Sequence, residues 1–172
     1  MFADDTSLLV TGESAEEVID EAKVTKDSFK NWCSRNKLSL NINKSEIVVF
    51  GTKRSKINAP ISIDLEDLSV TINQLTKFLG IYIEQNLKWN EHVDILNKRL
   101  SSVCYTLHVL KYQVDINVLK LVYYANFQSL MTYGISLWGA SNSCYKIFIT
   151  QKRALRMIFG LRFRGSLKRI TF

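Results

Sequence analysis

Two adjacent carboxylates, Asp4 and Asp5, stand directly before an apolar, β-prone run at Thr6–Val10. Carboxylates at the edge of a strand can hold divalent metal ions, which phosphoryl transfer uses to activate an attacking hydroxyl and to stabilise a leaving oxygen. Hard oxygen ligands of this kind suit Mg²⁺ or Mn²⁺. Taken alone, however, an Asp-Asp pair is more often a solvated turn than a metal site. The interpretation of the pair therefore depends on the elements that surround it.

An amphipathic helix is predicted after the acidic pair. Ser14 stands three residues before Glu17, which is the capping-box pattern of a helix start. The apolar residues that follow recur on one helical face: Val18, Ala22, Phe29 and Trp32. The helix is expected to run from residue 14 to about residue 36. Glu13, Glu16 and Glu17 fit the positive end of this helix dipole better than a metal site.

Short extended segments are predicted between the helix and residue 83. They are Leu38–Lys44, Ile47–Phe50, Ile61–Ile63, Val70–Ile72 and Phe78–Ile83. A charged loop with three basic residues, Lys53, Arg54 and Lys56, separates the second segment from the third. The loop ends at the single proline of the chain, Pro60.

From Asn90 onward the pattern is helical. Apolar residues alternate in steps of three and four at Val93, Leu96, Leu100, Val103, Leu107 and Leu110. This ladder predicts bundle core rather than a dimerising coiled coil, because it spans fewer than three heptads. Asp115 is predicted to cap a second helix, and Ser143 or Asn142 a third that reaches about Phe159. The fold class is therefore predicted to be α+β, with a boundary near residues 88–90.

Composition narrows the class of protein. The 172 residues carry 23 Lys+Arg against 16 Asp+Glu, a formal net charge of +7, which favours an anionic partner such as nucleic acid or an anionic membrane surface. Three cysteines lie far apart in apolar stretches, which predicts reduced thiols in an intracellular protein. No apolar run of about 20 residues is present, so no membrane-spanning segment is predicted, and the N-terminus lacks a signal-peptide pattern. Nucleic acid, not a membrane, is the partner expected.

Two motifs in the first half resemble those of reverse transcriptases. Phe2-Ala3-Asp4-Asp5 before an apolar strand resembles the aromatic-Ala-Asp-Asp catalytic hairpin of that family. Leu38-Ser39-Leu40-Asn41, followed by Lys44-Ser45-Glu46, resembles the next family motif, Leu-x-Leu-Asn and Lys-[Ser/Thr]-Glu. The two occur in the order and at the spacing of the family.

Two later motifs point to non-LTR (LINE-type) retrotransposons. Phe78-Leu79-Gly80-Ile81 with Leu87-Lys88-Trp89 is similar to the non-LTR form of the primer grip. Tyr133-Gly134-Ile135 with Trp138-Gly139 resembles the thumb of insect-type, jockey-like elements. The resemblance covers essentially the whole chain. No single motif is specific, whereas four in the correct order are.

The resemblance implies an RNA-directed DNA polymerase, which transfers a nucleotide from a dNTP onto a primer 3′-hydroxyl using an RNA template and Mg²⁺ or Mn²⁺. Asp4 and Asp5 would be the metal-binding carboxylates. Lys44 would approach the incoming nucleotide as a cation. The turn that positions the primer end would consist of Leu79, Gly80 and Ile81, with Gly80 allowing close approach of a backbone.

The resemblance also implies a division into subdomains. Residues 1–89 would be a partial palm and residues 90–172 a helical thumb or connection region. A further catalytic Asp and the fingers of the family would precede Met1. We therefore expect a fragment that does not polymerise DNA on its own, located in the nucleus or the cytoplasm; its oligomeric state stays open.

The C-terminal segment is strongly basic. The predicted nucleic-acid-binding residues are Lys152, Arg153, Arg156, Arg162 and Arg164. Phenylalanines interleave with them, and such a patch would bind phosphates in a salt-sensitive, sequence-blind manner. A solvated cationic face over core phenylalanines explains the pattern as well. Two alternatives to a polymerase segment therefore remain: a non-catalytic RNA- or DNA-binding module and an inert transposon remnant.

Overall fold

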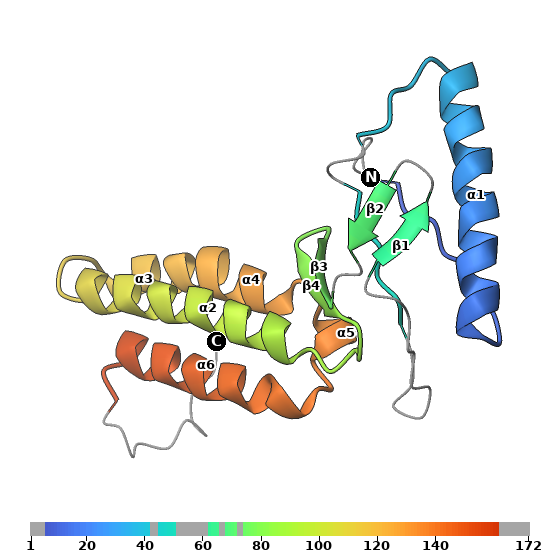
Figure 1. Cartoon of the computed structure of the whole chain (residues 1–172). Coiled ribbons are helices and arrows are strands. Elements are labelled where there is room, and N and C mark those ends of the chain that lie inside the picture. The colour runs from blue at the N-terminus through green and yellow to red at the C-terminus, as the bar shows by residue number, and fades with distance from the viewer. Residues whose placement is uncertain (1–5, 42–44, 51–61, 66–67, 72–73, 162–172) are drawn as a thin grey trace. The chain divides into compact units, whose positions relative to one another are not determined.

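The computed structural model describes residues 6–41, 45–50, 62–65, 68–71 and 74–161. The chain divides into two compact units, Met1–Thr76 and Lys77–Phe172, and each is described by itself. Helices dominate, with short antiparallel strands between them, so the predicted α+β class is confirmed (Figure 1). The sequence places its subdomain boundary near residues 88–90, whereas the division into units falls within the strand Leu75–Phe78.

Helix α1, Ala15–Arg35, is the main element of the first unit. The side chain of Ser14 accepts a hydrogen bond from the Glu17 amide at 3.1 Å, and the Glu17 carboxylate accepts one from the Glu13 amide at 2.9 Å. The first bond satisfies an amide that a helix start leaves without an intrahelical partner, and the second ties the residue before the cap to the first turn. The predicted helix is confirmed, and Glu16 and Glu17 lie in its first turn.

A small hairpin completes the described part of the first unit. Strand β1, Ser62–Leu65, pairs antiparallel with β2, Leu68–Thr71, in a register that runs from Ser62 opposite Thr71 to Leu65 opposite Leu68. The strands predicted at Ile61–Ile63 and Val70–Ile72 are thereby confirmed within two residues.

Two other predicted extended segments of this unit are wrong. Thr6–Val10 has no regular secondary structure, and in Ile47–Phe50 only Ile47 makes an isolated β-bridge. A β-prone run becomes a strand only where a neighbour supplies its hydrogen bonds. Among the residues described for this unit, β1 and β2 pair with each other and neither run joins them.

A second hairpin precedes the helices. Strand β3, Leu75–Phe78, pairs with β4, Ile81–Glu84, through a two-residue turn, Leu79–Gly80. The single segment predicted over Phe78–Ile83 is therefore wrong, because the turn interrupts it. Leu79 has a φ of +47° and Gly80 a φ of +84°, the left-handed pair that the commonest tight hairpin turns require.

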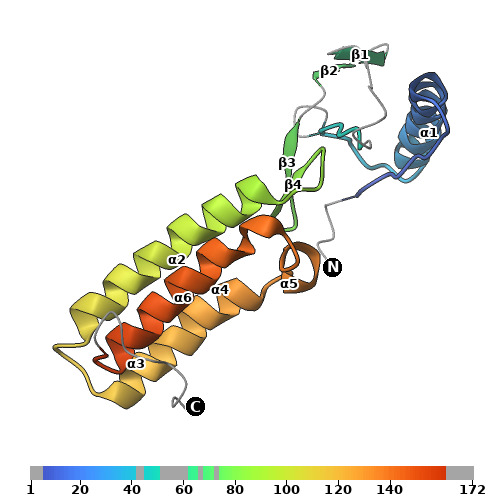
Figure 2. The ribbon, with the colours of Figure 1, turned by 90° about the horizontal axis from the view of Figure 1, so that it is seen from below.

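Three helical columns form the body of the second unit, side by side in both Figure 1 and Figure 2. The first is α2, Asn90–Leu110, and the third is α6, Tyr145–Ile158. The second is continuous but changes type. It begins as α3, Ile116–Val122, becomes the π-helical segment η2, Tyr123–Gln128, and ends as α4, Ser129–Thr132.

The predicted helix caps have mixed outcomes. Asp115 caps α3, since its carboxylate accepts from the Asn117 amide at 3.1 Å. Ser143 and Asn142 do not cap α6. They lie in a 3₁₀ turn, η3, Asn142–Cys144, that leads into the helix. A further short helix, α5, Ile135–Trp138, was not predicted.

The core lies between the three columns. It is lined by the α2 ladder, by Leu119, Tyr123 and Phe127 of the second column, by Trp138, and by Ile147, Ala154 and Ile158 of α6. Four ladder residues are buried and Val103 and Leu110 pack against them, so the ladder is bundle core as predicted. The Tyr123 side chain brings a polar group into this core. The Tyr123 hydroxyl donates to Gln128 at 3.1 Å and accepts from Gln151 at 3.2 Å.

The cysteines are all free thiols. Cys33 and Cys104 are buried, and Cys144 is half-buried. Burial raises the pKa of the Cys104 thiol above its ordinary value, since the apolar core disfavours the thiolate. The prediction that no disulfide framework is present is confirmed.

Candidate nucleic-acid interface

Several residues singled out from the sequence lie outside the described residues. Asp4, Asp5 and Lys44 are among them, and so are Arg162 and Arg164. Their predicted roles stay predictions. The described residues do include the predicted primer-grip turn, Leu79 to Ile81, and the first three of the predicted nucleic-acid-binding cations.

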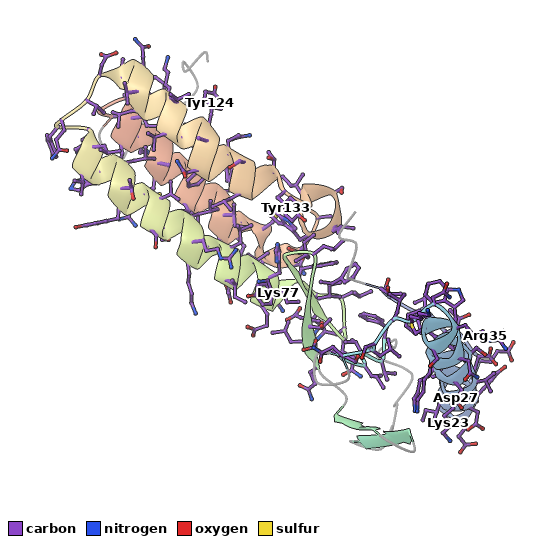
Figure 3. All side chains as sticks on the ribbon, turned by 90° about the horizontal axis from the view of Figure 1, so that it is seen from above. Lys23, Asp27, Arg35, Lys77, Tyr124 and Tyr133 are labelled. Carbon is purple, nitrogen blue, oxygen red and sulfur yellow. The ribbon has the colours of Figure 1, made fainter. Side chains whose placement is uncertain are left out.

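Tyr133 holds the Leu79–Gly80 turn against the helices. Its hydroxyl donates a hydrogen bond to the Leu79 carbonyl oxygen at 2.5 Å. Figure 3 shows Tyr133 at one end of the bundle, after the last turn of α4. The two motifs most typical of non-LTR elements, 54 residues apart in the sequence, therefore meet in space.

The close backbone approach at this contact occurs at Gly134. A Cβ atom at Gly134 would lie 2.6 Å from Cδ1 of Ile81, a distance that real Cβ atoms essentially never show. A Cβ atom at Gly80 would lie 3.6 Å from the Tyr133 ring, an ordinary contact. Gly80 makes no comparably close contact among the described residues, and the close approach to a primer predicted for it stays a prediction. Gly80 is required for its positive φ, and Gly134 for both its φ of +62° and its lack of a side chain.

An aromatic box surrounds His92 next to the turn. The His92 ring lies 6.4 Å from the rings of Tyr82 and Trp89 and 5.8 Å from that of Trp138. Its Nδ1 accepts a hydrogen bond from the Tyr82 amide at 3.3 Å. Trp138 is buried and donates from Nε1 to the Tyr133 carbonyl oxygen at 3.1 Å. Trp138 is thus a packing anchor of the core, and Trp89 contributes a half-buried edge.

Glu84 joins the hairpin to the first turn of α2. Its carboxylate accepts hydrogen bonds from the amides of Asn90 at 3.0 Å and Glu91 at 3.2 Å, and the side chain is buried. These amides form the positive end of the helix dipole, so the carboxylate caps the helix. This cap could not be predicted from the sequence, because Glu84 stands six residues before the helix, at no standard capping distance.

A small cavity lies under the turn. Its volume is about 60 Å³, and its lining includes Gly80 and Tyr133 on one side and His92 and Arg99 of α2 on the other. The buried Nε2 of His92 has no hydrogen-bond partner in the described part of the chain. Since Nδ1 accepts from Tyr82, Nε2 carries the proton of the neutral ring. The cavity is large enough for water, which needs about 10–15 Å³ per molecule.

His92 should make stability depend on pH. Burial, with a smaller contribution from Arg99, lowers the pKa of His92 below its usual value of 6.5. As pH falls below 6.5, the unfolded chain takes up this proton before the folded chain does, so the free energy of unfolding should fall until the pH passes the folded pKa. Urea unfolding between pH 7.5 and 5 measures this. The non-titrating variant His92→Gln should show a shallower fall, and an equal slope in both proteins would contradict the assignment.

One face of α6 combines cations with an aromatic ring. Lys152, Arg153 and Arg156 lie on neighbouring turns of this helix; Arg153 is exposed, whereas Lys152 and Arg156 are half-buried. Their role in nucleic-acid binding stays a prediction. The Lys152 ammonium lies 4.0 Å from the centre of the exposed Phe148 ring. A fourth cation, Lys146, donates a hydrogen bond from Nζ to Oδ1 of Asp94 at 2.5 Å, and this bond raises the pKa of Lys146. Cations interleaved with exposed rings can contact phosphates and bases together.

The described residues contain neither a metal cluster nor a membrane-spanning helix. No group of three or more His, Cys, Asp or Glu side chains there is placed to hold a metal ion. Among the helices that the structure describes, none combines the length and apolar character needed to cross a bilayer.

Three curated proteins are similar to this chain. One, described as a probable RNA-directed DNA polymerase from transposon BS of Drosophila melanogaster, is 28% identical over 91% of this chain. A second carries the same description for transposon X-element of that species and is 23% identical over 92% of the chain. The third, from Nasonia vitripennis, is a retrovirus-related Pol polyprotein from the type-1 retrotransposable element R1 4, 25% identical over 80% of the chain.

The similarity covers only part of these relatives. The chain spans 18% of the length of each of the two Drosophila proteins and 40% of the Nasonia protein. No family model matches the chain, and no solved structure matches it significantly.

Proposed function

Because this chain is homologous to the RNA-directed DNA polymerases of non-LTR retrotransposons, we propose that it is a segment of such a reverse transcriptase that binds the primer–template duplex. The observation that carries the proposal is the contact between Tyr133 and the Leu79–Gly80 turn. It joins the two motifs by which the sequence resembles these elements. A shared ancestry explains why motifs so far apart in sequence form one contact.

In this proposal residues 1–89 belong to the palm and residues 90–172 to the thumb. The turn from Leu79 to Ile81 is the primer grip; Leu79 and Gly80 are exposed, whereas Ile81 is buried. The helical thumb then supplies the basic face of α6, where Lys152, Arg153 and Arg156 contact the sugar–phosphate backbone of an RNA template paired with a DNA primer. Such contacts position a duplex without reading its sequence.

Catalysis in the intact enzyme would use Asp4 and Asp5 to hold Mg²⁺ or Mn²⁺. Their carboxylate oxygens are the hard donors that these ions prefer. The metal would supply activation of the primer hydroxyl and stabilisation of the leaving pyrophosphate. Lys44 would neutralise the phosphates of the incoming dNTP. The described residues add no metal cluster of their own, so this part of the proposal depends on the acidic pair.

The test of duplex binding is the double variant Lys152→Gln/Arg153→Gln. Each phosphate contact releases counterions, so losing one should reduce the slope of log affinity against log salt by about 0.9 for a duplex. We expect the double variant to bind an RNA–DNA duplex at least tenfold more weakly at low salt, with a shallower slope. Fluorescence anisotropy between about 50 and 200 mM salt measures both quantities.

The control is Lys23→Gln/Lys98→Gln. It removes the same charge from exposed residues of α1 and α2. If both double variants weaken binding equally, net charge alone drives binding and the α6 interface is wrong. Primer extension with Mg²⁺ is a separate test of residual activity. Extension that Asp4→Ala abolishes would show that the chain retains polymerase activity, whereas duplex binding without extension agrees both with an inactive polymerase segment and with a non-catalytic binding module.

A further inference from the structure

We infer that Tyr133 and His92 are positioning residues: together they fix the primer-grip turn, Leu79 to Ile81, on the end of the helical bundle. The inference rests on the proposed function, because the fixed turn would serve to place a primer end. The fixing of the turn itself depends only on contacts within the second unit. Neither residue is expected to touch the reacting atoms.

The hairpin cannot set the direction of its own turn. β3 and β4 are four residues each, and a two-stranded hairpin of this size is at best marginally stable in water. Leu79 also adopts a φ of +47°, which is unfavourable for a side chain with a Cβ. A turn that must hold a primer end therefore needs support from the helices, and two hydrogen bonds provide it.

The first support reaches the turn through Tyr133. The hydroxyl of Tyr133 bonds the Leu79 carbonyl oxygen, while the carbonyl oxygen of Tyr133 accepts from the buried indole of Trp138. Tyr133 is thus held at both ends, by the turn and by the core. Gly134 follows directly, and its missing side chain lets Ile81 pack against the backbone there.

The second support reaches β4 through His92. His92 is only 6% exposed and projects from the first turn of α2. Its Nδ1 accepts from the Tyr82 amide, one residue beyond the turn. The two supports hold the turn from opposite helices, the end of α4 and the start of α2, and they line the same cavity. The turn therefore has one position relative to the bundle rather than several.

The first test replaces one hydroxyl group. Tyr133→Phe in the full chain should speed amide hydrogen exchange at Gly80 and Ile81 by about five- to tenfold, the population change that one hydrogen bond is worth. Tyr105→Phe is the control, since Tyr105 is 70% exposed on α2. The wild-type chain should also bind a duplex with a recessed primer 3′ end more tightly than a blunt duplex, and Tyr133→Phe should reduce that preference severalfold.

The second test uses rescue at position 92. His92→Phe removes the acceptor and should speed exchange of the Tyr82 amide, whereas His92→Asn keeps an acceptor close to the Nδ1 position and should restore part of the protection. A merely structural packing role would rank the two variants in the opposite order, because phenylalanine fills the aromatic box better.

The outcomes separate this inference from the proposed function. Unchanged exchange at Gly80 and Ile81 in Tyr133→Phe overturns the inference even if duplex binding is intact. Faster exchange with an unchanged or absent preference for recessed ends overturns it as well, because the turn would then be fixed without serving a primer. The proposed function fails separately, if the wild-type chain shows no salt-sensitive duplex binding; the exchange measurements need no nucleic acid.

Discussion

Replacing Phe127 with alanine should lower the free energy of unfolding by about 3–5 kcal/mol. Phe127 is 0% exposed and stacks on Tyr123 at a ring distance of 5.2 Å, within the π-helical segment of the second column. Removing the ring leaves a cavity that the surrounding columns can close only in part. Because a domain of this size has about 5–15 kcal/mol in total, the loss should remove a large share of the stability of the bundle.

The matched control is Phe148→Ala. Phe148 belongs to α6 and is 54% exposed, so its truncation should change the free energy of unfolding by about 1 kcal/mol or less, including its contact with Lys152. Urea unfolding followed by far-ultraviolet circular dichroism measures both variants. Similar losses for Phe127→Ala and Phe148→Ala would show that the ring of Phe127 does not occupy a close-packed core.

Gly134→Ala should be strongly destabilising for the addition of a single methyl group. It places a Cβ atom 2.6 Å from Cδ1 of Ile81 and forces a side chain into a backbone with a φ of +62°. The left-handed backbone costs about 1–2 kcal/mol and the overpacking about 1–3 kcal/mol. We expect a loss of about 2–4 kcal/mol, measured by thermal or urea unfolding of the full chain.

Two further variants isolate the steric part of this effect. Gly160 has nearly the same φ, +64°, but nothing lies within 4 Å of its Cβ position, so Gly160→Ala should show the backbone cost alone. Ile81→Val removes Cδ1. Alone it should destabilise by about 0.5–1.5 kcal/mol, yet in the Gly134→Ala background it should restore stability. If Ile81→Val destabilises both backgrounds equally, the clash is not the cause.

The sequence predicted those elements whose signals are local. The α2 ladder repeats with helical spacing at six apolar positions between Val93 and Leu110. Ser14 and Asp115 cap their helices through bonds to amides three and two residues away. Periodicity and capping chemistry act within a few residues, so they are readable without a fold. The motif order likewise predicted the relatives that the comparisons found.

The features that could not be predicted depend on contacts between residues that are distant in the sequence. Nothing in the sequence around Thr6–Val10 shows whether a partner strand exists, so the β-prone run predicted a strand that is not present. The π-helical turn of Tyr123–Gln128 follows the packing of Tyr123 and Phe127 into the core, which local propensity does not encode. The roles of Gly134 and His92 also arise only when the hairpin meets the helices.

The contact between Glu84 and the start of α2 has a consequence for local unfolding. The Glu84 carboxylate belongs to β4, yet it satisfies the first amides of α2. If the hairpin separates from the bundle, the helix loses its cap, and if the helix frays, a buried carboxylate loses its donors. Strand β4 and helix α2 should therefore open as one cooperative unit, so that a nucleic acid that displaces the hairpin would also destabilise α2.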